Sequence, residues 1–365
     1  MNRWYQPDVF IPHSDYFVPV AENLLSDTYH PETNSLGYTY KVSQYKRPSD
    51  YLPFYTSLTQ SKEGLFALAS NNFNTVQYDC VIGASHSFDN YIASDYNGAK
   101  FKIHMKESAY NVEFLTDSLF LATTNNNVID FYNTKEPLID NNIMKRVTRL
   151  FSDGKVTQTL VLDNYRILVG TKKGSIECYE YSNSDSIQTL FSFLNAHQTE
   201  IKGLSAVPNK INQWMSCSSF EVLYWDKRQI YPARAVLERH NIMSGLTSID
   251  CYKDYYFIIT DNSGEILVYD IRCSINNVVF QMTINDKIDK VQFNGENKFS
   301  MISGNSNKIK FFEINKIQET VQVHEQQTPE HIYSMCWDKT GNKNDTCYIV
   351  GKKKYAKEIQ IKAKV

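Results

Sequence analysis

The chain lacks any apolar stretch near the length of a membrane span. Its first residues, MNRWYQPDVFIPHSDYFVP, are polar and aromatic and lack the apolar core of a signal peptide. An excess of charge of one sign is also lacking, because 38 basic side chains stand against 40 acidic ones and the net charge is -2. No field therefore attracts nucleic acid or an anionic membrane, and we expect neither as a direct partner.

Cysteines are few, and no two of them form a CxxC pair. Most of the seven stand inside apolar runs: Cys80, Cys178, Cys217, Cys251, Cys273, Cys336 and Cys347. This odd number and this placement are typical of reduced, buried thiols and argue against a disulfide framework or a zinc site. They favour a cytoplasmic or nuclear protein.

Signatures of catalysis are also lacking: the chain has no GxSxG, no HExxH and no Walker loop. The stretch GTKKGS reads as strand, turn and strand, so it provides no helix N-terminus for a phosphate. Glu177 and Glu180 share one strand without facing each other across a cleft, which is weak evidence for acid–base work. We therefore predict no catalytic residue, no cofactor and no metal.

Strand signals recur along the chain, whereas helix signals are scarce. A strand ending of the form apolar, any, any, aromatic, acid appears as IECYE, VLYWD, ILVYD and IKFFE, with a fainter copy in VIDFY. Its aromatic residues are spaced by 48, 46, 44 and 43 residues: Phe131, Tyr179, Trp225, Tyr269 and Phe312. Each ending follows a polar turn and two further apolar runs. Three legible strands and a less regular fourth, at this spacing, indicate the blade of a β-propeller.

The remaining chain predicts an all-β fold with seven blades, because one further blade precedes the five clear repeats and one follows them. We expect an irregular N-terminal arm over residues 1–50 and the propeller over residues 51–365. A propeller needs closure, and the stretch Tyr51 to Thr59 is the candidate strand to join the last blade. The arm is rich in Tyr and Trp, so it docks on its own ring or on a partner.

The pair Trp225-Asp226 has two possible interpretations: a catalytic carboxylate beside an aromatic residue, or a degenerate copy of a structural repeat. The repeat favours structure: Trp225 packs between neighbouring blades, and Asp226 ends the strand at a solvated edge. Tyr269 and Asp270 take the same roles one repeat later. WD-type blades often bury a hydrogen-bonded His, Ser or Thr, Asp and Trp. His197 lies 28 residues before Trp225 and fits that set, with Ser216 or Ser218 as the hydroxyl, but the turn acid is missing.

A loop predicted over Asn71 to Asp79 carries the apolar residues Phe73, Val76 and Tyr78 between the strands LFALAS and CVIGAS. Apolar side chains on an exposed tip need a cover. Either they fold back on their own blade or they bind a partner, and the resemblance of this blade to a known family favours partner binding.

Read in order, the blades resemble the WD-repeat propeller subunit of the methylosome, the Valois-like family. The resemblance runs from about Lys62 to Ile361. It includes SKEGLFALASNNFNTVQYDCV, AYNVEFLTDSLFLATTNNNVIDFY and HEQQTPEHIYSMCWDKTG. It is densest in NAHQTEIKGLSAVPNKINQWMSCSSFEVLYWDKRQIYPA, with its His-led turn, Ser-Cys-Ser end and WD-x-R-x-x-x-P-A exit.

The resemblance implies a non-catalytic scaffold that binds the symmetric (type II) protein arginine methyltransferase and helps to recruit substrates such as Sm proteins and histones. In that family a loop of the first blade inserts a Trp into the methyltransferase, and the matching position here is Tyr78. Another propeller scaffold, for example of nuclear-pore or coat type, is the alternative. An enzyme with its site at the central channel would need converging ionisable residues at strand starts, and the sequence shows no such set.

Overall fold

The computed structural model describes residues 30–33, 39–42, 54–71, 78–84, 101–105, 109–124, 127–138, 143–163, 165–182, 186–229, 233–237, 244–253, 255–272, 278–316, 319–341, 345–352 and 355–361. The chain divides into two units, residues 1–52 and 53–365. In the first unit, strand β1 (His30–Thr33) pairs antiparallel with β2 (Thr39–Val42). The rest of the predicted arm lies outside the described residues.

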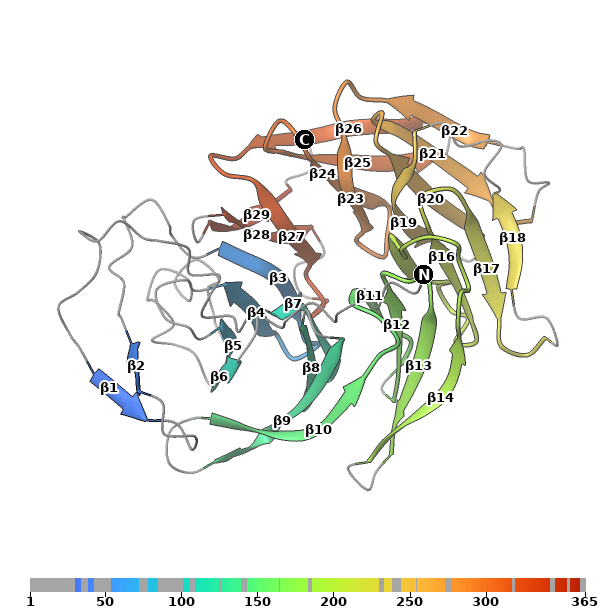
Figure 1. Cartoon of the computed structure of the whole chain (residues 1–365). Helices are drawn as coiled ribbons and strands as arrows, with labels where there is room; N and C mark the ends of the chain where they lie inside the picture. The colour runs from blue at the N-terminus through green and yellow to red at the C-terminus, as the bar shows by residue number, and fades with distance from the viewer. Residues whose placement is uncertain are drawn as a thin grey trace, which may run out of the picture. The chain divides into compact units, whose positions relative to one another are not determined.

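Strands, and no α-helix, make up the regular structure of the described residues, which confirms the all-β prediction. In the second unit the strands form a β-propeller whose sheets follow one another around an axis (Figure 1). There are six sheets, numbered I to VI in chain order, and each inner strand is the first strand of its antiparallel run.

The strands of the six sheets have the following bounds. Sheet I contains β3 (Phe54–Gln60), β4 (Leu65–Asn71), β5 (Tyr78–Ala84), β6 (Phe101–Met105), β7 (Ala109–Thr116), β8 (Leu119–Thr124), β9 (Val128–Leu138) and β10 (Ile143–Phe151). Sheet II contains β11 (Val156–Val161), β12 (Arg166–Thr171), β13 (Ile176–Tyr181) and β14 (Ile187–Phe193). Sheet III contains β15 (Gly203–Ala206), β16 (Gln213–Cys217), β17 (Val222–Asp226) and β18 (Ala233–Leu237). Sheet IV contains β19 (Leu246–Tyr252), β20 (Tyr256–Asp261), β21 (Glu265–Asp270) and β22 (Val278–Thr283). Sheet V contains β23 (Ile288–Phe293), β24 (Lys298–Ser303), β25 (Lys308–Lys316) and β26 (Glu319–Gln327), and sheet VI contains β27 (Ile332–Trp337), β28 (Thr346–Gly351) and β29 (Ala356–Gln360).

Sheet I consists of two antiparallel four-stranded runs, β3 to β6 and β7 to β10. They are joined at their outer strands by one parallel pair, in which Ile143 of β10 lies opposite Lys102 of β6. With these runs merged, the described residues of the second unit form six sheets, and this number does not confirm the predicted seven blades.

Burial explains why three strands of each repeat are legible in the sequence and the fourth is not. The second strands β16, β24 and β28 are buried along their whole length, and each contains a short apolar run with few polar residues. The outer strands β14 and β22 are half-buried or exposed, so their sequences are mixed. The apolar core lies between neighbouring sheets, as in the cluster that joins Val207 and Met215 of sheet III to Ile249 and Phe257 of sheet IV.

The turn GTKKGS connects β12 to β13, as predicted. Gly174 has a φ of +85°, and a Cβ there would lie 2.2 Å from the backbone oxygen of His197. Glycine at this position therefore lets the turn approach the segment that leads into sheet III.

The closing strand predicted at Tyr51 to Thr59 is wrong in its pairing. The chain turns back at Gly64, so β3 forms a hairpin with β4 and becomes an inner strand of sheet I. Sheet VI keeps three strands among the described residues. Closure is made by packing and side chains instead, because Leu58 is buried against Cys336 and its N–H donates to Ser334 Oγ at 3.2 Å.

The first and last sheets are joined by the same kind of hydrogen bond that joins other neighbouring inner strands. In these four junctions, the backbone N–H of one inner strand donates to a serine of the inner strand before it, at 2.9–3.3 Å. The pairs are Val112 with Ser57, Cys251 with Ser205, Val291 with Ser248, and Leu58 with Ser334. The first and last sheets are thus joined as neighbours are elsewhere.

Candidate functional site

Trp225 packs where sheets II and III meet, as the sequence predicted. Its ring stacks on Trp214, with ring centroids 5.9 Å apart, and on Phe193 of β14 at 5.0 Å. The same apolar cluster includes Leu168 and Cys178 of sheet II. Trp225 therefore forms part of the core between two sheets.

A buried chain of hydrogen bonds surrounds the Trp225 indole. Its Nε1–H donates to Ser216 Oγ at 2.8 Å, and Ser216 Oγ lies 2.6 Å from His197 Nε2. His197 Nδ1 lies 2.9 Å from a carboxylate oxygen of Glu221. With the imidazole proton on Nδ1, the serine hydroxyl donates to His197 and His197 donates to Glu221. His197 thus lies in the hydrogen-bonded set that the sequence predicts, and its hydroxyl partner is Ser216, not Ser218.

The prediction that this set lacks an acid is wrong. Glu221 supplies the acid from the turn between β16 and β17, directly before the strand that carries Trp225. The hydrogen bond from His197 lowers the pKa of Glu221, although partial burial opposes the shift. The sequence signal was an acidic residue in the turn between the second and third strands.

Asp226 is not at a solvated edge, contrary to the prediction. Its side chain is 5% exposed, because Arg228 covers it with bonds from Nε at 2.9 Å and from Nη2 at 2.7 Å. Gln213 Nε2 donates a further bond at 2.8 Å. These bonds, that of Arg228 first, lower the pKa of Asp226. These bonds fix the carboxylate at the end of its strand, which agrees with a structural role and not a catalytic one.

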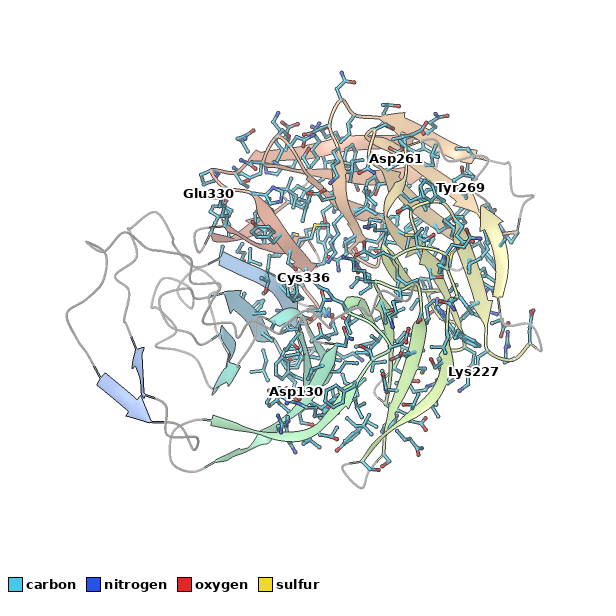
Figure 2. The ribbon with its side chains drawn as sticks, viewed as in Figure 1. Asp130, Lys227, Asp261, Tyr269, Glu330 and Cys336 are labelled. Carbon is cyan, nitrogen blue, oxygen red and sulfur yellow. The ribbon has the colours of Figure 1, made fainter. Side chains whose placement is uncertain are left out.

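Tyr269 and Asp270 repeat the arrangement in sheet IV. Tyr269 is buried between sheets III and IV and stacks on Phe257, with ring centroids 5.3 Å apart (Figure 2). Asp270 accepts bonds from Arg272 Nε at 3.0 Å and Nη2 at 2.6 Å. Tyr269 therefore packs between neighbouring sheets, as predicted. Asp270 does not lie at a solvated edge, contrary to the prediction, because its side chain is 8% exposed.

The faint repeat copy is shifted by one residue. In the other sheets the repeat aromatic lies opposite the second residue of the second strand, as Trp225 lies opposite Trp214. In sheet I the residue opposite Phe120 is Tyr132, and Phe131 points to the other side of β9. Tyr132, not Phe131, is thus the repeat aromatic, and the first spacing shortens from 48 to 47 residues.

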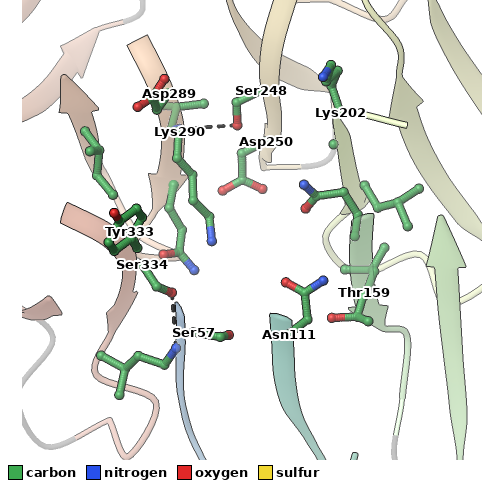
Figure 3. A pocket seen from close by; sticks show the side chains of 18 of the residues that line it. Ser57, Asn111, Thr159, Lys202, Ser248, Asp250, Asp289, Lys290, Tyr333 and Ser334 are labelled. Carbon is green, nitrogen blue, oxygen red and sulfur yellow. Dashed lines mark hydrogen bonds between the residues drawn. The ribbon is translucent and has the colours of Figure 1, made fainter. Parts of the chain in front are cut away.

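A polar channel of about 440 Å³ lies where the inner strands meet (Figure 3). Residues from β3, β7, β11, β15, β19, β23 and β27 line it. Among them are the ionisable residues Glu113, Asp250, Lys290 and Lys339. The sequence was expected to bring no converging ionisable set to the channel, and the structure corrects this expectation.

The channel carboxylates are used to join sheets. Asp250 of sheet IV accepts a bond from Ser205 of sheet III at 2.6 Å and from the N–H of Phe293 of sheet V at 2.8 Å. Glu113 accepts bonds from Thr59 at 2.8 Å and from Lys339 at 2.9 Å. Contacts of this kind hold the ring together, and they favour structural roles over proton transfer.

Burial favours the uncharged forms of two groups in the channel, and so it shifts their pKa values. It raises the pKa of Asp250, against the bonds from Ser205 and the backbone, and it lowers the pKa of Lys290. The side chains of Lys290 and Asp250 both point into the channel (Figure 3).

The residues predicted to bind a partner are only partly described. Phe73 and Val76 lie outside the described residues. Tyr78 was placed in a loop, but it is the first residue of β5 and lies opposite Met105 of β6. Asn71 and Asp79 also belong to strands, because the ladders of β4 and β5 extend further than the sequence indicates. The predicted bounds of the loop, Asn71 and Asp79, are therefore wrong at both ends.

The side chains of five of the seven cysteines are described, and all five are buried free thiols. Burial raises the pKa of Cys178 to about 11 and those of Cys251 and Cys336 to about 12. Thiols held protonated in this way are poor nucleophiles.

Within the described ranges, no three His, Cys, Asp or Glu side chains are grouped to hold a metal ion. No helix in the part of the chain that the structure describes is long and apolar enough to cross a membrane. No protein-family model and no curated protein matches the chain.

Proposed function

We propose that the chain is a non-catalytic scaffold built on a seven-bladed propeller of the WD-repeat type. The two four-stranded runs of sheet I count as two blades, which with sheets II to VI gives seven. The observation that carries the WD assignment is the chain of bonds from Trp225 through Ser216 and His197 to Glu221. This set joins the three polar partners that a WD-type blade places around its Trp.

The partner we propose is the symmetric (type II) protein arginine methyltransferase, with Sm proteins or histones as recruited substrates. The ordered sequence resemblance supports this partner, and it is densest in sheet III, the sheet that contains the bonded set. The engagement of Asp250 and Glu113 in joining sheets supports a scaffold over an enzyme. The cytoplasm and the nucleus are the compartments proposed for this work.

Replacing Tyr78 tests the partner directly. Replacing an aromatic anchor at an interface with Ala typically weakens binding by about 2–4 kcal/mol. We therefore expect Tyr78→Ala to weaken binding to the purified methyltransferase at least about tenfold by calorimetry, at about 1.4 kcal/mol per factor of ten. The matched control is Tyr165→Ala, since Tyr165 is 52% exposed and lies between β11 and β12 of sheet II, not in sheet I.

Three results would count against this role. Unchanged affinity with an intact fold removes the anchor role of Tyr78. A loss of thermal stability in Tyr78→Ala supports a side chain folded back on its own sheet. If the main chain that co-purifies from native lysate is a nuclear-pore or coat subunit, the methyltransferase proposal is wrong and the alternative scaffold replaces it.

A further inference from the structure

The loops at one end of sheets III and IV form a continuous surface. In sheet III the N–H of Lys227 donates to the backbone oxygen of Asn212 at 3.0 Å, which joins the loop after β17 to the loop after β15. In sheet IV the N–H of Ile271 donates to the oxygen of Tyr255 at 2.7 Å and makes the same junction. We call this surface the basic rim; its residues are Lys210, Ile211, Lys227, Arg228, Lys253, Tyr255 and Arg272.

Cations stacked on aromatic rings connect the two sheets of the basic rim. Lys210 Nζ of sheet III lies 4.8 Å from the ring centre of Tyr255 in sheet IV. The guanidinium of Arg272 lies 4.2 Å from the same ring. These contacts orient two positive charges on one tyrosine.

Two further lysines of the basic rim also face rings. Lys253 Nζ lies 4.9 Å from the Tyr252 ring, and Lys227 Nζ lies 5.7 Å from the Phe191 ring of β14. Ring contacts of this kind leave the ammonium groups of both lysines available to an acidic partner.

The carboxylates described in these loops do not neutralise the lysines. Asp226 and Asp270 are clasped by Arg228 and Arg272 through paired bonds. Five cations against two carboxylates leave three positive charges, and counting Asp254, which lies outside the described residues, leaves two. The whole chain has a net charge of -2, so the basic rim stands out against its background.

Apolar surface is exposed among these charges. Ile211 is 60% exposed and Tyr255 is 38% exposed. Exposed apolar groups rimmed by charge mark interaction sites on soluble proteins. A segment that fits both features has acidic residues on either side of an apolar one.

We propose that the basic rim binds an acidic segment of a partner protein, in which Asp or Glu residues flank an apolar side chain. The carboxylates pair with Lys210, Lys227 and Lys253, and the apolar side chain packs on Ile211 and Tyr255. Nucleic acid fits less well, because it offers no apolar group for Ile211 and the chain as a whole is slightly acidic. This site is separate from the first hairpin of sheet I and does not depend on the methyltransferase.

Fluorescence anisotropy with a labelled peptide tests the proposal. The probe has glutamates flanking a phenylalanine, and its counterpart has lysines in place of the glutamates. The full chain binds the acidic peptide saturably, and added salt weakens this binding. Lys253→Glu and Lys210→Glu each weaken it about three- to tenfold, the effect of one or two exposed ion pairs. Ile211→Ser weakens it without changing its salt dependence.

The control variant is Lys172→Glu, which makes the same charge change on an exposed lysine in the turn between β12 and β13, at the other end of its sheet. It leaves the affinity unchanged, and thermal unfolding checks that every variant folds. Failure of the unmodified chain to bind the acidic peptide overturns the proposal. So does an equal loss in Lys172→Glu. Tighter binding of single-stranded DNA, weakened by the same variants, overturns it in favour of a nucleic-acid surface.

Discussion

Sheets III and V place an aromatic pair at the same register and stabilise it in different ways. Trp214 lies opposite Trp225 in sheet III, and Phe299 lies opposite Phe312 in sheet V. Both pairs are stacked and buried, with ring centroids 5.9 and 4.9 Å apart. The difference lies two residues further along the second strand, where sheet III has Ser216 and sheet V has Met301.

This difference contributes to whether a polar set can form, together with the choice of Trp, which has an N–H to donate, over Phe. Ser216 bridges an indole and an imidazole, whereas Met301 fills the equivalent space within an apolar cluster. The position is also apolar in sheets II and IV, where Val169 and Ile259 occupy it. Packing accepts many residue types, but the polar set needs particular residues at four positions. Among the described residues of sheets II to V, the polar set therefore forms in sheet III alone.

The largest effect is expected for Trp225→Ala. Emptying a buried aromatic site lowers the free energy of unfolding by about 3–5 kcal/mol. Phe312→Ala falls at the lower end of that range, because it removes packing without breaking a hydrogen bond. Urea unfolding of both variants measures the difference. A Trp225→Ala variant that keeps its melting temperature but loses partner binding would overturn the structural role of the residue.

Ser216→Ala is expected to have the next largest effect. The change leaves two buried nitrogens, Trp225 Nε1 and His197 Nε2, without the hydroxyl that serves both. Each such loss costs about 1–3 kcal/mol, so two of them sum to about 2–6 kcal/mol. We expect the lower part of this range, about 2–4 kcal/mol in the free energy of unfolding, because one hydroxyl serves both nitrogens. Ser218→Ala is the matched control, because Ser218 is equally buried and takes no part in the set. Similar losses in both variants would show that the hydrogen bonds of Ser216 add nothing beyond burial.

The sequence predicts what depends on local period and misses what depends on distant contacts. The burial of Trp225 and Tyr269 followed from the repeat spacing, because a strand pattern fixes which side chains face a neighbouring sheet. The pairing of β3 could not be predicted in this way. The sequence pattern of β3 would be the same whether it formed a hairpin with β4 or paired with β29. The boundary at Tyr78 depended on how far a ladder extends.

The channel residues show the same limit from another side. Glu113, Asp250 and Lys339 are far apart in the chain and meet only because the ring closes. Nothing in the sequence near any one of them indicates the others. Glu221, by contrast, could have been found, because it lies in the turn next to the strand of Trp225.

The smallest expected effect is a dependence on pH that the apolar packing of sheet V does not supply. The bond from His197 lowers the pKa of Glu221 in the folded chain below its ordinary value of 4.5. A carboxylate with a lowered folded-state pKa stabilises the fold above its unfolded-state pKa, and this contribution is lost as the pH falls through the folded-state value. Glu221 is partly exposed, so its contribution is discounted to about 1 kcal/mol from the 1.5–3 kcal/mol typical of bonds to charged groups.

Glu221→Gln should therefore lower the free energy of unfolding by about 1 kcal/mol at neutral pH, and the difference from the unmodified chain should vanish in acid. In a His197→Ala background the same change should have almost no effect, because the bonded partner is already absent. A loss of equal size in both backgrounds, or one that persists in acid, would mean that the bond between the Glu221 carboxylate and His197 does not stabilise the fold. The polar set of sheet III would then depend on Ser216 alone.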